Sequence, residues 1–231
     1  MKKLTKIAIG IGATLSVAAL GGVVAAAQYR ENIEEPAHEV IATGEGFELR
    51  QYAPMITAEV TIEGDRRRAT RAGFQRLAAY IFAQDRPGAA KDADQKEKIA
   101  MTSPVMQDQT QKIAMTSPVM QDNQDTEDAN GPWRTRFVMP SKYTMETLPE
   151  TPSDITLNTV PARRMAAVMF NGFGSADDLA VMETKLRTWI AEKGYETDGK
   201  VEYAFYDGPW VPGQYRRNEV LIPVAMPDTN D

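Results

Sequence analysis

The chain has 231 residues, a formal net charge of −6, no cysteine and a single histidine. The lack of cysteine excludes disulfides, zinc–thiolate sites, iron–sulfur clusters and thiol nucleophiles, and one histidine argues against multi-histidine metal sites and a Ser-His-Asp mechanism. At 42% hydrophobic residues the chain can bury one sizeable core. No long Lys/Arg block is present, so we do not expect nucleic acid as a partner.

The N-terminus has the residue pattern of a signal peptide or a membrane anchor. Residues 1–6 contain three lysines, and residues 7–27 contain no charged side chain. The run ends in three alanines, a pattern typical of a signal-peptidase site, yet at about 1.5 Å per residue it is also long enough to span a bilayer uncleaved. Both alternatives put the rest of the chain outside the cytoplasm. We therefore expect a periplasmic protein, or one anchored to the inner membrane by residues 7–27 and facing the periplasm.

One folded domain is expected at residues 38–226, between a polar linker (28–37) and a short C-terminal tail (227–231). Alternating apolar residues from Val40 to Ile62 predict two strands or one bent strand. Asp65 is a plausible N-cap for a helix whose apolar face continues to about Ala83.

An eleven-residue segment then appears twice. Residues 98–108 read KIAMTSPVMQD, and residues 112–122 repeat the same letters. Each copy alternates like a strand, and only Gln109-Thr110-Gln111 separates them, which predicts an antiparallel hairpin. A single repeat is too short for a solenoid. The pattern indicates a local tandem duplication.

The second half of the domain repeats the order of the first. Ser175 and Asp178 form a predicted capping box for a helix that ends at Gly194. Strand, helix, strand, strand thus occurs twice, which predicts an α+β domain with internal pseudo-symmetry and two helices on a curved antiparallel sheet. The further strands are expected at 133–139, 155–160, 164–170, 200–206 and 218–224.

Several motifs follow one another along residues 38–224. They are KIAMTSPV (112–119), FVMPSKY (137–143), LPETP (148–152), FNGF (170–173), YDGPW (206–210) and RRNEV (216–220). In this order they resemble the SOUL haem-binding protein family. The resemblance implies a distorted antiparallel β-barrel with two helices, built from a duplicated β-α-β-β unit and similar to the gyrase-inhibitor-like effector-binding fold. The chain departs from the family in carrying KIAMTSPV twice, and we take the second copy as the family's strand.

The same resemblance implies a ligand. It points to haem (haem b) or a related porphyrin, bound non-covalently by a buffer or carrier without catalysis. Two alternatives stay open: an enzyme that modifies the tetrapyrrole, for example by removing its metal, and a binding module for another apolar ligand or a protein partner.

A haem site needs an apolar slot, cations for the propionates and, optionally, an axial ligand. The family's slot is attributed to the first helix, whose apolar stripe could equally be ordinary core. His38 is the candidate axial ligand. A methionine of the repeat (Met101, Met106, Met115 or Met120), Tyr80, or an apolar pocket without a histidine ligand stay open as alternatives. The loop from Asp207 to Glu219 can be interpreted as an acid–base site or, as we favour, as a structural lock. The candidate haem-contacting residues are Arg67, Arg71, Phe74, Leu77, Ala78, Ile81 and Met115.

Overall fold

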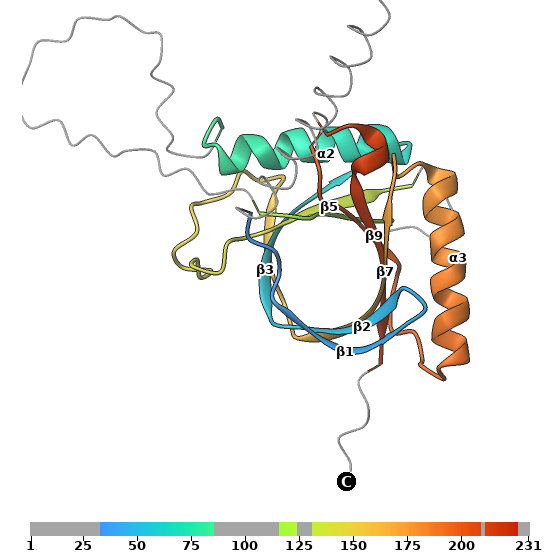
Figure 1. Ribbon diagram of the computed structural model, residues 1–231. Coiled ribbons are helices and arrows are strands. Elements are labelled where there is room, and N and C mark those ends of the chain that lie inside the picture. The colour runs from blue at the N-terminus through green and yellow to red at the C-terminus, as the bar shows by residue number, and fades with distance from the viewer. Residues whose placement is uncertain (1–32, 86–115, 124–130, 209–210, 226–231) are drawn as a thin grey trace, which may run out of the picture.

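The computed structural model describes residues 33–85, 116–123, 131–208 and 211–225. In these ranges two helices pack on one curled antiparallel sheet of nine strands (Figure 1). The elements are β1 (His38–Gly44), β2 (Phe47–Tyr52), β3 (Met55–Ile62), α2 (Arg66–Ile81), β4 (Val119–Asn123), β5 (Trp133–Val138), β6 (Thr156–Val160), β7 (Arg163–Asn171), α3 (Ala176–Glu192), β8 (Glu202–Phe205), the 3₁₀ turn η1 (Gly213–Tyr215) and β9 (Arg217–Val224).

The first stretch forms three strands where the sequence predicted one or two. A tight turn at Glu45 and Gly46, both with positive φ (55° and 85°), folds β1 back on β2. Pro54 then separates β2 from β3. The α+β class and the barrel are confirmed, with β1 as an additional edge strand.

The strand order shows the internal symmetry. The sheet runs β1-β2-β7-β9-β8-β4-β5-β3-β6, so that without β1 the two halves mirror each other about the β8–β4 pair. Each half contributes a strand pair, a helix and a second strand pair, which extends the predicted β-α-β-β unit by one strand at its start. That extra strand crosses over: β2 pairs with β7 of the second half, and β6 pairs with β3 of the first. The halves are therefore interlocked.

Helix α2 covers the outer face of β3 and β5. The Asp65 side chain accepts a hydrogen bond from the Arg68 amide at 3.2 Å, which confirms the predicted cap. Leu77 and Ile81 are fully buried against Ala58 and Phe137 of the sheet. Burial of one apolar face, rather than helix propensity, holds this helix in place.

Helix α3 covers the other half of the sheet in the same way (Figure 1). The predicted capping box is present, since Ser175 and Asp178 each accept a hydrogen bond from the other's amide at 3.1 Å. Leu186 and Trp189 are buried against β2, β7 and β9. Gly194, at φ 71°, follows the C-terminal end of the helix as expected.

The second copy of the repeat supplies β4. Residues Val119–Gln121 pair with β5 on one side and with β8 on the other. Since both edges are occupied, the predicted hairpin with the first copy is wrong for these residues. The first copy, at 98–108, lies outside the described residues. The second copy is the strand that enters the barrel.

Candidate functional site

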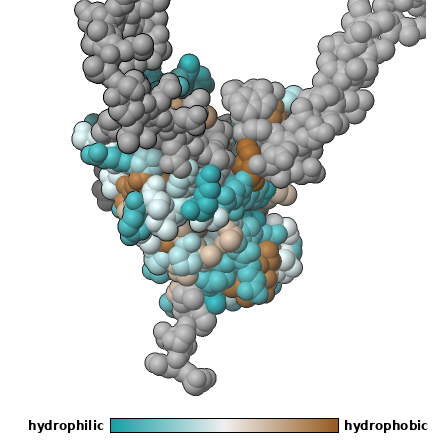
Figure 2. Space-filling model, turned by 90° about the vertical axis from the view of Figure 1, so that its left-hand side faces the viewer, coloured by the Kyte–Doolittle hydropathy of each residue, from teal (hydrophilic) through white to brown (hydrophobic). Residues whose placement is uncertain are grey.

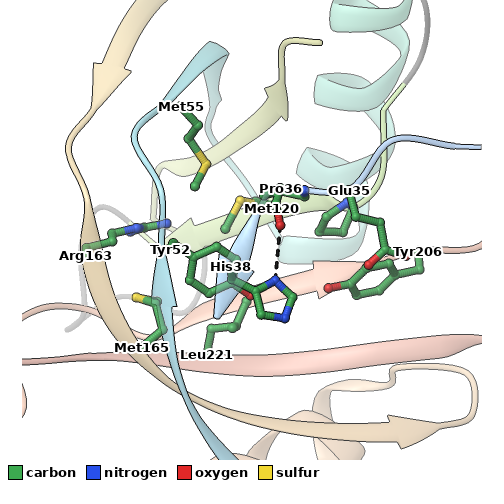
Figure 3. Close-up of a pocket in the computed structure, with 11 residues that line it drawn as sticks. Glu35, Pro36, His38, Tyr52, Met55, Met120, Arg163, Met165, Tyr206 and Leu221 are labelled. Atoms are coloured by element: carbon green, nitrogen blue, oxygen red, sulfur yellow. Dashed lines mark hydrogen bonds between the residues drawn. The ribbon is translucent and has the colours of Figure 1, made fainter. Parts of the chain in front are cut away.

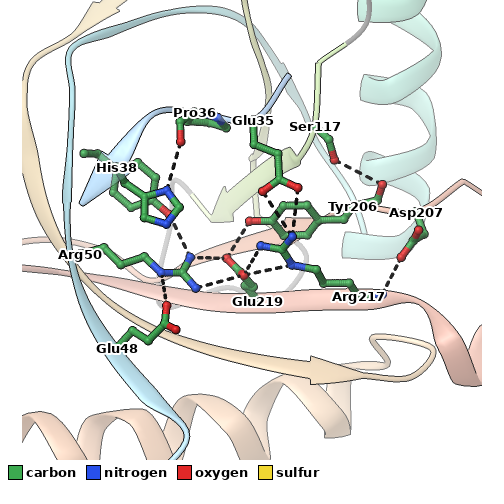
Figure 4. A network of polar contacts seen from close by, with 11 residues as sticks. Glu35, Pro36, His38, Glu48, Arg50, Ser117, Tyr206, Asp207, Arg217 and Glu219 are labelled. Atoms are coloured by element: carbon green, nitrogen blue, oxygen red, sulfur yellow. Dashed lines mark hydrogen bonds and ion pairs between the residues drawn. The ribbon is translucent and has the colours of Figure 1, made fainter. Parts of the chain in front are cut away.

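The inner face of the barrel carries buried charges. In β2, Leu49 packs outward against the α3 core, whereas its neighbour Arg50 points into the barrel and pairs with Glu219 of β9 (Figure 4). The Glu219 carboxylate, with no exposed surface, accepts bonds from Arg50 (2.8 Å), Arg217 (2.8 Å) and the hydroxyl of Tyr206 (2.7 Å). Every oxygen of this buried carboxylate is therefore matched by a donor.

These contacts fix the ionisation states. Burial would raise the pKa of Glu219, but hydrogen bonds and charge from Arg50 and Arg217 outweigh burial and bring it below its usual value. Burial and the neighbouring Glu219 charge raise the pKa of Tyr206 well above its usual range. At neutral pH Glu219 is thus a carboxylate and Tyr206 a neutral donor.

A second network lies on the neighbouring strands. Glu202 of β8 pairs with Arg163 (2.6 Å) and Arg136 (3.0 Å), and Arg136 also meets Asp122. Arg134 holds Asp122 at 2.9 Å. Burial opposes ionisation of Glu202, yet the two arginines lower its pKa. The first network thus links β2 to β9, and the second links β4, β5, β7 and β8 inside the barrel.

The loop from Asp207 to Glu219 is part of this framework. The Asp207 carboxylate accepts a bond from the Arg217 amide at 2.6 Å, and Arg216 Nε donates to the Val211 carbonyl at 2.9 Å. Arg217 and Glu219 belong to the buried network. These contacts support the interpretation of the loop as a structural lock.

A small pocket lies at the mouth of the barrel (Figure 3). His38 and Tyr52 come from the first hairpin, and their rings stand 4.9 Å apart. Its volume is about 10 Å³, enough for about one water molecule. The pocket is therefore too small for an organic ligand. The lining residues are Glu35, Pro36, His38, Tyr52, Met55, Pro118, Met120, Arg163, Met165, Tyr206 and Leu221.

A larger groove adjoins this pocket. Its volume is about 310 Å³, at the lower end of the range of ligand sites. The groove and the pocket share Glu35, Pro36 and Met55 as common walls. The other lining residues are Glu34, Ala37, Pro54, Ile56, Thr116, Val138, Met139, Pro140, Ser141, Tyr143 and Thr159, of which most are apolar.

His38, the first residue of β1, lines the small pocket but not the groove. Its Nδ1 is 3.1 Å from the carbonyl oxygen of Pro36, and because a carbonyl can only accept, Nδ1 carries the proton. In the neutral ring the other nitrogen, Nε2, then has no proton, and its lone pair can bind a metal ion. A backbone carbonyl on the second ring nitrogen is the usual arrangement for a metal-ligating histidine.

The candidate residues on α2 divide into two groups. Arg67 and Arg71 are exposed. Leu77 and Ile81 are fully buried in the core, and Phe74 packs edge-on against Phe137 with ring centroids 5.4 Å apart. Ala78 is half-buried on the same helix. Neither cavity is lined by these residues, and their role in haem binding stays a prediction.

Met115 lies outside the described residues, but the next residue in the described chain, Thr116, lines the groove. Within the described ranges no three His, Cys, Asp or Glu side chains are grouped to hold a metal ion. Nor does any described helix combine the length and apolar character needed to cross a membrane.

One face of the molecule is shown in space-filling form in Figure 2. Hydrophilic residues surround separate, small hydrophobic patches there. Large apolar side chains that are partly exposed, such as Val40 and Met145, are distributed over different elements. The groove is thus a more specific candidate than the outer surface.

Sequence reasoning missed most of the groove. Its walls come from residues 34–37, 54–56, 138–143 and Thr159, which lie far apart in sequence. Of the residues singled out in the sequence, His38 and the second KIAMTSPV copy lie at this end of the barrel.

A scan against protein-family models matches the SOUL haem-binding protein model over residues 33–223. The chain belongs to the SOUL haem-binding protein family. The match includes both helices and all nine described strands apart from the last residue of β9. A comparison with curated protein sequences gives no match.

The solved structures similar to this SOUL protein share its fold at low identity. An uncharacterised conserved protein from Listeria innocua is 15% identical, with 80% of this chain and 94% of that chain covered and a TM-score of 0.52. The EcmrR C-terminal domain is also 15% identical, with 78% and 96% covered and a TM-score of 0.50. A hydrolase from Listeria innocua is 12% identical, with 80% and 94% covered and a TM-score of 0.50. These likenesses confirm the effector-binding type of barrel.

Proposed function

We propose that this protein binds haem or a related porphyrin non-covalently at the mouth of its barrel. Membership of the SOUL family over most of the chain carries the proposal. The groove supplies apolar walls such as Ile56 and Met139, and the flexible thioether of Met55 stands between the groove and the pocket. The pocket alone, at about 10 Å³, is too small for a porphyrin, so the groove would take the ring.

His38 is the proposed axial ligand. The Pro36 carbonyl fixes the tautomer that presents Nε2. The two tyrosines that line the pocket, Tyr52 and Tyr206, have pKa values raised by burial, which disfavours the tyrosinate that iron requires. Arg67 and Arg71 on α2, the propionate contacts expected from the sequence, line neither the pocket nor the groove, so their role stays a prediction.

A carrier or buffer fits the buried groups better than an enzyme. Removal of the metal from a porphyrin needs an acid that protonates the pyrrole nitrogens. The buried carboxylates Glu202 and Glu219 have pKa values lowered by paired arginines, so they are poor proton donors. We place the carrier outside the cytoplasm because of the charge-free run 7–27 behind three lysines.

A haemin titration of the purified full chain tests the proposal. We expect a saturable, shifted Soret band at about one haem per chain, and a further spectral change in His38→Ala if Nε2 binds iron. An unchanged band in His38→Ala would assign binding to the groove alone. No saturation would refute haem binding, and loss of iron from bound haem would instead support the metal-removing enzyme.

Cell fractionation tests the location. Release of the protein with the periplasmic contents would indicate cleavage after residue 27, and retention with the inner membrane would indicate an anchor. Recovery in the cytoplasm would refute an extracytoplasmic role.

A further inference from the structure

The segment Glu34–Ala37, which we call the strap, crosses the barrel mouth. The Glu34 carbonyl accepts a bond from the Ser117 amide (3.0 Å), and its carboxylate accepts one from the Ser141 amide (2.8 Å). The Ala37 carbonyl accepts a bond from the Ala53 amide (3.0 Å). The strap is thus tied to three separate parts of the chain around the mouth.

Glu35 is the residue of the strap that reaches the arginines. Both of its carboxylate oxygens lie near Nη1 of Arg217, at 3.0 and 3.3 Å (Figure 4). The Arg217 guanidinium lies 3.7 Å from the ring centre of Tyr206 and binds Glu219 through its other nitrogens. Arg217 therefore has one permanent carboxylate partner within the barrel and a second one at the rim.

The two partners differ in how easily they can be replaced. The side chain of Glu219 is fully buried, whereas that of Glu35 is 30% exposed. Removing Glu219 would deprive Arg50 and Arg217 of the fully buried carboxylate that they share. Moving Glu35 exposes one edge of Arg217 to a new partner and costs only a rim ion pair.

The strap also separates the two cavities. Glu35 and Pro36 line both the pocket and the groove. Displacement of these two residues would remove a shared wall and join the groove to the Met55 and Tyr206 side of the pocket. The combined space would have an apolar body and Arg217 at one end.

We propose that Arg217 forms a carboxylate subsite and that Glu35 occupies it in the ligand-free chain. The ligand class is an apolar molecule that carries a carboxylate, and a porphyrin propionate is one example. In this respect the inference rests on the proposed function, but it holds for any such ligand. Exchange of one carboxylate for another keeps Arg217 paired throughout, so binding creates no unpaired buried charge.

Glu35 then acts as a tethered competitor, and its removal should strengthen binding. Rim ion pairs of this kind are weak, so we expect Glu35→Gln to raise the affinity for an apolar carboxylate about two- to five-fold. Glu39→Gln is the matched control, because it makes the same charge change on an exposed residue four positions away.

The experiment uses two probe pairs that differ only in the carboxylate. The first is haemin and its dimethyl ester, and the second is pyrenebutyrate and pyrenebutanol, followed by fluorescence. We expect Glu35→Gln to gain affinity for haemin and pyrenebutyrate, and to bind the ester and the alcohol as the unaltered chain does. In the double variant with Arg217→Gln, whose fold is checked by circular dichroism, the gain should vanish.

Equal gains in Glu35→Gln and Glu39→Gln would overturn the subsite, because they would reflect net charge alone. An equal gain in affinity for the dimethyl ester and pyrenebutanol would also overturn the subsite, because neither probe carries a carboxylate. If haemin fails to bind any variant but the pyrenebutyrate gain is present, haem binding is refuted and the subsite stands. If haemin binds and neither carboxylate probe gains, the subsite is refuted and haem binding stands.

Discussion

At the scale of single residues, Glu219 is the centre of the barrel's polar interior. It accepts hydrogen bonds from Arg50, Arg217 and Tyr206 and has no exposed surface. We expect Glu219→Gln to lower the free energy of unfolding by about 3 kcal/mol or more, because it removes the fully buried carboxylate that Arg50 and Arg217 share and leaves them only their more exposed partners. Urea denaturation followed by circular dichroism measures this loss.

Glu48→Gln is the control for that variant. The Glu48 carboxylate pairs with Arg50 Nε at 2.7 Å, but the Glu48 side chain is 36% exposed. We expect Glu48→Gln to lower the free energy of unfolding by less than about 1 kcal/mol. Similar costs for both variants would show that the buried end of the network contributes no more than the exposed end.

The same carboxylates predict a pH dependence. The pKa values of Glu202 and Glu219 lie below their usual value in the folded chain, so on acidification the unfolded chain takes up protons first. Their stabilisation is present above the ordinary glutamate pKa of 4.5 and is lost as the pH falls through their lower folded-state pKa values. Unfolding free energies measured between pH 7 and pH 3 should decrease, and in Glu219→Gln the decrease should be smaller. Equal slopes would contradict the assignment.

The sequence did not predict that these charges are buried. The alternation of Arg134 and Arg136 with Trp133, Thr135 and Phe137 shows correctly that the two sets lie on opposite faces of a strand. Periodicity cannot tell whether the polar face of a strand meets water or the inside of a curled sheet. Only the pairing of distant strands decides this.

At the scale of elements, α2 approaches β5 at a glycine. A Cβ on Gly73 would lie 2.4 Å from Oγ1 and 2.7 Å from Cβ of Thr135. Gly→Ala in a helix usually stabilises by about 1 kcal/mol. We expect Gly73→Ala to destabilise instead, by about 1–3 kcal/mol, because the helix must move away from the sheet. Thermal denaturation should show a lower midpoint.

Ala72→Gly, at the exposed neighbouring position, is the control for helix propensity and should cost about 1 kcal/mol. A stabilised Gly73→Ala variant would mean that α2 does not pack as closely as described.

The duplicated segment gives a second prediction at this scale. Both edges of Val119–Gln121 are already paired. Deletion of residues 98–111 leaves one copy of KIAMTSPVMQD, and we expect the unfolding midpoint to stay within the error of the measurement. Gln121→Pro should destabilise strongly, because a central strand cannot lose its amide donor. A large loss on deletion would assign a structural role to the first copy.

Elements with local signals were predicted best. Asp65, Ser175 and Gly194 mark helix ends through hydrogen bonds to their own neighbours, and these predictions are confirmed. The hairpin of the two copies failed because a short connection favours local pairing only while no other strand competes. In the barrel β5 and β8 occupy those edges.

At the scale of the whole molecule, the two interlocked halves should unfold together. Each half has its own helix and apolar core, but β2 and β6 each complete the sheet of the other half. We expect one calorimetric transition with equal calorimetric and van't Hoff enthalpies. Leu77→Ala should reduce the free energy of unfolding by about 2–5 kcal/mol. It should therefore lower the midpoint temperature of this single transition.

Leu186→Ala, in the core of the other half, is the matched variant and should shift the same transition. Two separate transitions, each moved by only one of the variants, would show that the halves are independent units.

Much of the architecture was predictable, but the groove was not. Two repeats of strand, helix and strands suffice to indicate a pseudo-symmetric barrel. The groove depends on where Pro54, Pro140 and Thr159 meet after folding, and none of these residues has a local pattern that marks a ligand site.

The position of the strap has a consequence for how the protein would be loaded. Six residues, 28–33, separate Ala27 from Glu34, and even a fully extended chain of that length reaches only about 20 Å. If the charge-free run stays in the bilayer, the barrel mouth lies within that distance of the lipid headgroups, and an apolar ligand could pass directly from the membrane to the groove. If the run is cleaved, the same mouth opens to water, and the ligand must arrive by diffusion or from another carrier. Cleavage of this run would thus decide whether the barrel takes its ligand from the membrane or from water.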